Sequence, residues 1–314
     1  YFKINALGLV FQFGYNIIAA ILRGIGDSKA TLYFLLIASI INVVLDILFV
    51  YNFDMGVAGA AIATDIAQIV SCIAAFIYMV KKYPLFRWKL KEFTFEWKLA
   101  KLTLQRGFPM ALQQLIVSVG FVFIQRAVNS YGEAMTASYS VAQKLETYMT
   151  LPANALMTTQ STYTAQNIGA GKMDRVMTGA KHTVVISEVI SICILAVVFV
   201  FTTPIVTAFG LGSEAAGYCT SHVRCVAICL IPFASYFPLL GLFQGANNAL
   251  YSTFVATSAL AIRAVSTYAL QGIPAISYNM IWWNTIFGWG LGCILAWVHF
   301  FRGKWKMSFN KLQG

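Results

Sequence analysis

LYFLLIASIINVVLDILFVY, residues 32–51, is the stretch that decides the fold. A helix rises about 1.5 Å per residue, so these twenty residues cover about 30 Å, the thickness of the hydrocarbon core of a membrane. Lipid offers the backbone no hydrogen-bond partners, so a segment of this kind must be helical. Asp46 interrupts the run, and an ionisable group inside a membrane span is a functional candidate.

Apolar runs of similar length occupy most of the remaining chain. They are residues 4–22, 57–80, 108–129, 135–158, 183–203, 217–242, 253–271 and 279–301. Charged residues make up only 11% of the sequence, whereas soluble domains carry about 25%. An outer-membrane barrel would show short alternating segments instead. The sequence therefore predicts an all-α polytopic membrane protein with nine transmembrane helices in this chain.

Lysine and arginine indicate the orientation. Segment 81–107 holds eight of them, and alternating the helices from this loop places 17 of the 22 basic residues on one side. The predicted outer loops 52–56, 130–134, 204–216 and 272–278 hold none. The basic side is expected to be cytoplasmic, in the plasma membrane of a bacterium. The net charge of +11 is thus explained by the membrane, and we expect no nucleic-acid partner.

Cysteine and histidine give no sign of a metal site. All six cysteines lie in apolar runs without a CxxC pair, and His182, His222 and His299 are far apart in the sequence. We read the cysteines as small packing residues. No nucleophile, base and orienting group occur together either, so we expect neither an enzyme nor a cofactor.

The last three apolar runs repeat the first three at an offset of 221 residues. Residues 22–27, LRGIGD, then align with residues 243–248, FQGANN. Equivalent helices run in the same direction, as in parallel transporter repeats. We therefore predict a partial amino-terminal lobe at 1–80, a basic cytoplasmic linker at 81–107, and a carboxy-terminal lobe with a basic tail at 108–314. The second copy has three additional helices, which predicts that roughly 115 residues or more are missing upstream of the first.

Four motifs resemble the multidrug and toxic compound extrusion (MATE) family. They are LRGIGDSKATL (22–32), INVVLDILFV (41–50), MGVAGAAIAT (55–64) and AQNIGAGKMDRV (165–176). The resemblance covers the whole chain. It implies a two-lobe bundle of twelve helices around a central cavity, of which this chain would hold helices four to twelve. It also implies export of amphipathic, often cationic, organic compounds, driven by inward flow of protons or sodium ions.

A cation-coupling site is predicted in the first lobe. Asn42 and Asp46 are four residues apart and so share one helix face. A carboxylate in such surroundings can exchange a proton for a cation. The resemblance implies that Asn42, Asp46 and Thr64 join a cation site with an aspartate of the first family helix, upstream of this chain. Alternatively, Asp46 lies near the outer water layer and only caps or pairs. Asp65 is a weaker candidate that would face an aqueous cleft.

Other polar residues receive structural or cavity roles. Gly24 and Gly26 read as turn formers, and Asp27 as the cap of the next helix. Arg263 lies in the middle of run 253–271, where it would pair with Glu146 or with the amides Gln113 and Gln114, or would shape the substrate cavity.

Aromatic residues such as Tyr236 would line that cavity for organic cations, or simply pack in the core. Sodium-coupled members of the family carry acids on the seventh and tenth helices. Run 217–242 has no acid, which argues against a sodium site in the second lobe.

The sequence is thus interpreted as a monomeric antiporter that exports small amphipathic or cationic compounds by alternating access. Its other partner would be membrane lipid, and its only bound ion the transported proton or sodium. Two alternatives remain open at this stage. One is a lipid-linked saccharide flippase, whose cationic cavity would use Arg263 and Arg224. The other is a non-transporting remnant of a truncated gene.

Overall fold

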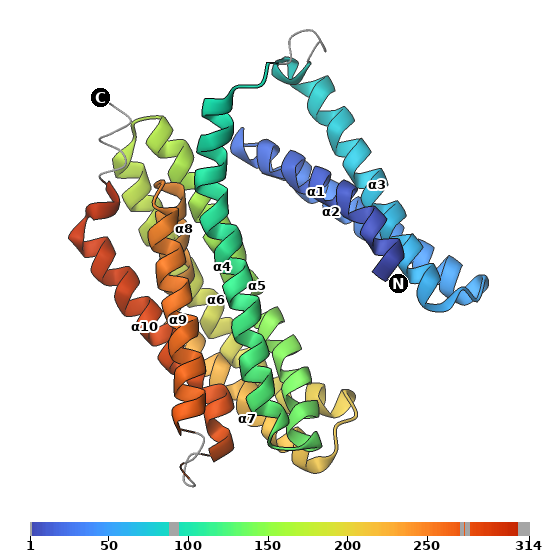
Figure 1. The fold of residues 1–314 in the computed structure, drawn as a ribbon, viewed down its shortest axis with the longest axis vertical. Helices are drawn as coiled ribbons and strands as arrows, with labels where there is room; N and C mark the ends of the chain where they lie inside the picture. The colour runs from blue at the N-terminus through green and yellow to red at the C-terminus, as the bar shows by residue number, and fades with distance from the viewer. Residues whose placement is uncertain (1, 88–93, 271–272, 274–276, 307–314) are drawn as a thin grey trace. The chain divides into compact units, whose positions relative to one another are not determined.

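The computed structural model describes residues 2–87, 94–270, 273 and 277–306, and these residues contain helices and no strand (Figure 1). The chain divides into two compact units, Tyr1–Glu96 and Trp97–Gly314. Each unit is described by itself. The all-helical architecture follows from the apolar runs, because a helix satisfies every backbone hydrogen bond within the segment.

The first unit contains three helices, α1 (Phe2–Gly24), α2 (Ser28–Asp46) and α3 (Gly56–Lys82). α2 continues beyond Asp46 as a π-helical segment, Ile47–Asn52. α3 packs against both α1 and α2. Its buried face consists mainly of small residues, which allow close helix packing: Gly59, Ala61, Ala63, Ala67, Ser71, Ala75 and Met79.

The second unit contains seven helices. These are α4 (Trp97–Asn129), α5 (Glu133–Gly169), α6 (Met173–Ala208), α7 (Ser213–Leu230), α8 (Tyr236–Gly245), α9 (Ala249–Leu270) and α10 (Met280–Arg302). α5 packs against α6, α7 and α8, while α9 packs against α4 and α10. α4 begins within the predicted linker 81–107. Residues 88–93 of that linker, residues 272 and 274–276 of an outer loop, and the tail 307–314 lie outside the described residues.

The predicted run 217–242 is interrupted at Ile231–Ser235, where the chain leaves α7 and enters α8. Pro232 lies in this break, and proline removes a helical hydrogen bond. Side chains of neighbouring helices bond to the break. The Ser187 hydroxyl donates to the Ala234 carbonyl at 2.8 Å, and Trp297 Nε1 donates to Ser235 Oγ at 2.9 Å.

The repeat offset recurs in the turns of the two units. Asp27 N donates to Leu22 O at 2.8 Å, and Asn248 N donates to Phe243 O at the same distance, 221 positions later. The residue before each donor, Gly26 or Asn247, has a positive φ. Glycine and asparagine are the residues that adopt this backbone conformation most readily. The same turn therefore joins equivalent helices in both units.

Within the described part of the chain, six helices are long and apolar enough to cross a membrane: α2 with its π segment, α3, α4, α6, α9 and α10. The predicted count of nine is not confirmed. α8 has only 10 residues because of the break, and α7, with 18 residues, contains Glu214, His222 and Arg224. α5 has 37 residues, but threonine, glutamine and asparagine recur along it. In α1 the apolar stretch among the residues with described side chains is Gly8–Gly24.

Candidate functional site

In the first unit, the structure joins two of the predicted coupling residues. Asn42 on α2 donates from Nδ2 to Thr64 Oγ1 on α3 at 3.3 Å. The Thr64 hydroxyl in turn donates to the Ala60 carbonyl at 2.9 Å, within its own helix. This back-bond orients the Thr64 oxygen so that a lone pair faces α2. Asn42 and Thr64 thus form a polar bridge across the α2–α3 interface.

Asp46 lies one turn further along α2, at the point where the helix becomes π-helical. Its Oδ1 atom is buried and accepts no hydrogen bond from the residues that the structure describes. A buried carboxylate oxygen without a partner is costly unless it binds a proton or a cation. π-helical turns also occur often at functional sites. The donor set of Asp46, Asn42 and Thr64, all oxygen or amide groups, fits a proton or a hard cation such as sodium.

Asp65 lies on a different side of α3. A Cβ added to Gly8 of α1 would lie 2.1 Å from Asp65 Oδ1, so the carboxylate packs directly on the α1 backbone. Thr64 contacts α2 instead. Asp65, the weaker candidate for coupling, therefore lies at the α1–α3 interface, apart from the Asn42–Thr64 bridge at the α2–α3 interface.

Asp27 is the N-cap residue of α2 and accepts a hydrogen bond from Ala30 N at 3.4 Å. Its Oδ2 atom also accepts from Lys82 at 2.9 Å, Tyr83 at 2.7 Å and Tyr78 at 2.9 Å. These bonds, those from Lys82 and Tyr83 foremost, hold the pKa of Asp27 well below its usual range. Gly24 ends α1, and Gly26, with φ of 93°, forms the turn. The cluster ties the α1–α2 turn to the end of α3.

In the second unit, the five residues predicted for the substrate cavity or the interior of the lobe all line a single cavity of about 290 Å³. They come from four helices: Gln113 and Gln114 from α4, Glu146 from α5, Tyr236 from α8 and Arg263 from α9. Aromatic and aliphatic groups complete the wall, among them Phe121, Phe237, Leu260 and Trp289. A few convergent polar groups in an apolar wall are typical of a site for a small organic molecule.

Arg263 and Glu146 in the cavity wall belong to a network of charged and polar groups that extends into the interior of the unit. Arg263 Nε donates to Asn284 Oδ1 at 2.7 Å, and Arg263 Nη2 lies 4.0 Å from Glu146 Oε1. Glu146 Oε2 lies 3.3 Å from His222 Nε2, an ion-pair distance outside hydrogen-bond geometry. Asn284 Nδ2 donates to Thr267 Oγ1 at 3.1 Å. Arg263 and His222 are almost completely buried, so the network holds charge inside the unit.

Sequence reasoning missed His222 and Asn284 as members of this network. Neither has a polar neighbour at helical spacing that would have marked it. His222 lies between the rings of Tyr139 and Trp282, at 5.6 Å and 5.8 Å between centroids. Only the packing of α7 against α5 brings it to Glu146. Arg224, considered for a cationic cavity, does not line this one and instead lies over the Phe199 ring, 5.5 Å from its centroid.

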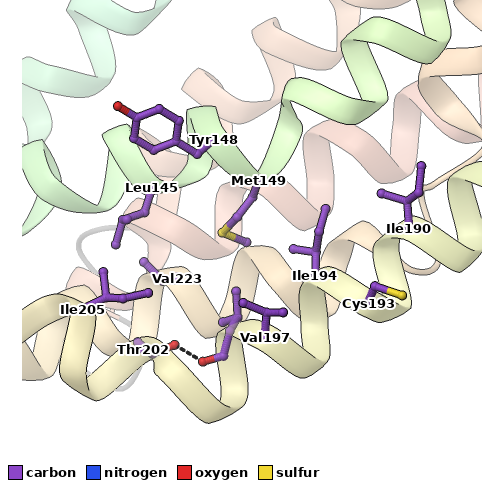
Figure 2. Close-up of a pocket in the computed structure, with 11 residues that line it drawn as sticks. Leu145, Tyr148, Met149, Ile190, Cys193, Ile194, Val197, Thr202, Ile205 and Val223 are labelled. Carbon is purple, nitrogen blue, oxygen red and sulfur yellow. Dashed lines mark hydrogen bonds between the residues drawn. The ribbon is translucent and has the colours of Figure 1, made fainter.

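A second hollow, between α5 and α6, has different chemistry (Figure 2). Its volume is about 490 Å³, and its wall is almost entirely aliphatic or aromatic. Figure 2 shows Leu145 and Met149 of α5 facing Ile194 and Ile205 of α6, with Val223 of α7 beside them. The Thr202 hydroxyl in this wall bonds within its own helix, to the Val198 carbonyl. The wall of this groove is thus almost entirely apolar, unlike that of the cavity at Arg263.

With its long apolar helices and an internal charged network, the chain has the architecture of a polytopic integral membrane protein. The MatE family model matches residues 1–48 and 109–269. The chain belongs to this family.

Named relatives and solved structures agree with this assignment. The chain is 28% identical to "Probable multidrug resistance protein YpnP" of Bacillus subtilis, over 98% of its own length and 68% of the relative. It is 30% identical to "Probable multidrug resistance protein YoeA" of the same species, over 67% of its length and 47% of the relative. "Multidrug export protein MepA" of Staphylococcus saprophyticus is 22% identical to the chain, over 90% of the chain and 62% of the relative.

Two solved structures share the fold. One is a MATE protein in the bent conformation, with a TM-score of 0.86 at 21% identity, covering 100% of this chain and 69% of that one. The other is a MOP superfamily transporter from Pyrococcus furiosus, with a TM-score of 0.85 at 21% identity. It covers 96% of this chain and 67% of that one.

Proposed function

We propose that this protein exports amphipathic organic compounds across a bacterial plasma membrane, coupled to inward movement of protons or sodium ions. Membership of the family and the names of its relatives support the export of drugs. The observation that carries the coupling is the buried Oδ1 of Asp46, which has no hydrogen-bond partner among the described residues. The chain spans about two thirds or less of its relatives, so the activity is proposed for the whole gene product.

Coupling follows from the alternatives open to Asp46. When the carboxylate is ionised and unpartnered inside the membrane, it is costly, and binding a proton or cation removes that cost. A conformation that gives the ion access to Asp46 is therefore stabilised by the ion. A ligand shifts a conformational equilibrium only by its differential affinity for the two states. Ion binding from outside would then favour the outward-open state and release of the exported compound. No cofactor beyond the transported ion is needed, and the protein carries out transport and no covalent chemistry.

The proposed topology has nine membrane crossings in this chain, with the protein acting as a monomer. α7 and α8 count as one crossing that is broken at Ile231–Ser235, and α1 and α5 cross in spite of their length or composition. Discontinuous helices of this kind often mark binding sites in transporters. α8 begins with Tyr236, which lines the cavity of the second unit. We assign that cavity to the exported compound.

A lipid-linked saccharide flippase is a second candidate, favoured by Arg263 in the cavity wall. Two observations favour the exporter. Arg224, the other cation that a diphosphate would need, does not line the cavity. The cavity wall is also largely aromatic and aliphatic, with Phe121, Phe237, Leu260 and Trp289, which suits an amphipathic compound better than a saccharide diphosphate.

The test compares two aspartates in the complete gene product. Asp46→Asn removes the titrating group at the proposed site. Asp54→Asn is the matched control, because Asp54 is exposed in the outer turn and asparagine tolerates its φ of 52°. Drug efflux is measured in everted vesicles after a proton or sodium gradient is imposed.

We expect Asp46→Asn to lower gradient-driven efflux about tenfold, within the 5–150-fold range that is typical of coupling between two ligand sites. We expect Asp54→Asn to match wild type, and both variants to insert equally. Wild-type efflux from the Asp46 variant would refute the coupling role. Lack of drug efflux from the wild type under either gradient, with transport of a lipid-linked precursor, would favour the flippase.

A further inference from the structure

The two units carry opposite charges on equivalent helices, four residues apart along the aligned sequences. At the offset of 221 residues, Asn42 corresponds to Arg263 and Asp46 corresponds to Thr267. The turns show that this offset is structural, because the same hydrogen bonds recur in both units. A carboxylate and an amide in the first unit are thus replaced by a hydroxyl and a guanidinium in the second. If the first arrangement suits a cation, the second suits an anion.

The guanidinium of Arg263 still has hydrogen-bonding capacity on the side of the cavity. Arginine has five N–H donors in a planar fork. Among the described residues, only Nε is engaged in a hydrogen bond, with Asn284 Oδ1 at 2.7 Å. That bond fixes the orientation of the guanidinium plane. The guanidinium carbon Cζ also lies over the Phe121 ring, 5.6 Å from its centroid. Arg263 is only 7% exposed, yet it lines the cavity, so both Nη groups are available there to a ligand.

Glu146 does not occupy this fork. Its Oε1 lies 4.0 Å from Arg263 Nη2, whereas charge-assisted hydrogen bonds are about 2.7–2.9 Å long. Its other oxygen is closer to His222 Nε2, at 3.3 Å. Glu146 therefore compensates the buried charge of Arg263 at a distance, as a buried cation requires. It also competes with any anion that enters the cavity, and this gives the proposal a second test.

We propose that the cavity of the second unit binds the carboxylate of an amphipathic organic acid or zwitterion through the Nη groups of Arg263. Carboxylates match the fork of arginine with two parallel hydrogen bonds. The apolar part of the ligand then lies against Phe121, Leu260 and Trp289, which line the same cavity. The volume of about 290 Å³ admits a compact ligand, such as a naphthoate, rather than a large macrocycle.

The test measures binding to the purified protein by calorimetry, with three probes of one shape. 2-Naphthoate carries the carboxylate, 2-naphthamide is neutral, and 2-naphthylmethylammonium is cationic. We expect the acid to bind at least about tenfold more tightly than the amide, since the bidentate charged bonds are lost in the amide. We expect the ammonium compound to bind most weakly. Equal binding of the acid and the amide, or preference for the ammonium compound, would overturn the proposal.

Variants then assign the preference to residues. Arg263→Gln should abolish the preference for the acid, and Arg263→Lys should reduce it, because lysine keeps the charge and loses the fork. Glu146→Gln should tighten binding of the acid severalfold, since it removes the competing carboxylate. Arg224→Gln is the control and should leave all three affinities unchanged. If the Arg263 variants do not fold, the Glu146→Gln variant tests the proposal alone. Binding of the acid to this variant that is weaker than, or equal to, binding to wild type would overturn the proposal.

This proposal rests on the proposed function only in treating the cavity as the site of the exported compound. Binding in detergent needs no ion gradient, so the two can fail separately. A protein that prefers the acid and shows no gradient-driven efflux would refute export and leave the site intact. A protein that exports cationic drugs and shows no preference for the acid would refute the site alone.

Discussion

Replacing Gly241 by alanine is expected to force α8 away from α5. A Cβ at this position would lie 2.2 Å from the Met157 carbonyl oxygen, and one at Gly245 would lie 2.3 Å from the Ser161 carbonyl oxygen. Both neighbours are backbone atoms, which cannot rotate aside. Cβ contacts under 3.0 Å essentially never occur, so the helices must separate by at least 0.8 Å at Gly241. The pair forms a GxxxG face for close helix contact.

The magnitude follows from two opposing terms. Overpacking a close interface costs about 1–3 kcal/mol, while alanine favours a helix over glycine by about 0.5–1 kcal/mol. The middle of the two ranges gives a net destabilisation of about 1.25 kcal/mol for Gly241→Ala. For a unit of this size that lowers Tm by roughly 2–5 °C. Because Tyr236 begins α8, the same displacement also moves one wall of the cavity that we assign to the exported compound.

The assay is thermal unfolding of the purified protein in detergent, and Gly217→Ala is the control. Gly217 lies within α7, and a Cβ added there would have nothing within 4 Å. At that position the helix preference acts alone, so alanine should stabilise by about 0.5–1 kcal/mol. The two substitutions are chemically identical and are expected to have opposite signs. A Tm for Gly241→Ala at or above that of wild type would refute the close approach of α8 and α5.

The remaining predictions concern single polar groups. The lowered pKa of Asp27 means that its bond to Lys82 stabilises the fold above about pH 4, the ordinary pKa, and that this contribution is lost as the pH falls further. In thermal unfolding, Asp27→Asn should therefore be less stable than wild type from pH 5 to 8, with the difference shrinking toward pH 3; a constant difference would contradict this. Asn284→Ala should cost about 1.5–3 kcal/mol, since it removes the hydrogen bond to Arg263. Thr285→Val should be neutral or slightly stabilising, because its buried hydroxyl oxygen has no partner among the described residues; a loss comparable to that of Asn284→Ala would show a missed partner.

The length of the apolar runs predicted the fold class, because the membrane constrains composition over about twenty residues at a time. The same runs predicted the positions of the helix ends poorly. α5 and α6 have 37 and 36 residues, about 55 Å each, far longer than the hydrocarbon core, and their polar ends resemble loops in composition. The break at Ile231–Ser235 was also missed, since Pro232 alone does not show whether a helix kinks or stops. Whether the helix kinks or stops depends on the hydrogen bonds that Ser187 and Trp297, both distant in sequence, donate to Ala234 and Ser235.

The candidate sites, too, were predictable only where the signal is local in the sequence. The spacing of four residues links Asn42 to Asp46, and a charge in the middle of an apolar run identifies Arg263. The contact of Asn42 with Thr64 entered through family resemblance, and the structure places it at 3.3 Å. The position of Asp65 against Gly8 depends on how α3 rotates between α1 and α2, which no local pattern specifies. His222 reaches Glu146 only through the packing of α7 on α5.

The opposite charges on equivalent helices, Asp46 in the first unit and Arg263 in the second, are the reason why we assign one unit to the ion and the other to the compound. A buried charge in a membrane needs a compensating group, and each unit provides it differently. Arg263 is compensated within its own unit by Glu146 and Asn284. Asp46 has a buried oxygen without a hydrogen bond among the described residues, and in the function that we propose its compensation comes from a proton or cation that can leave. In that mechanism only the site at Asp46 transmits the gradient, because only its occupancy varies with the ion concentration on each side. The proposed role of Arg263 is to recognise the carboxylate of the exported compound, while ion binding at Asp46 shifts the equilibrium between the conformations.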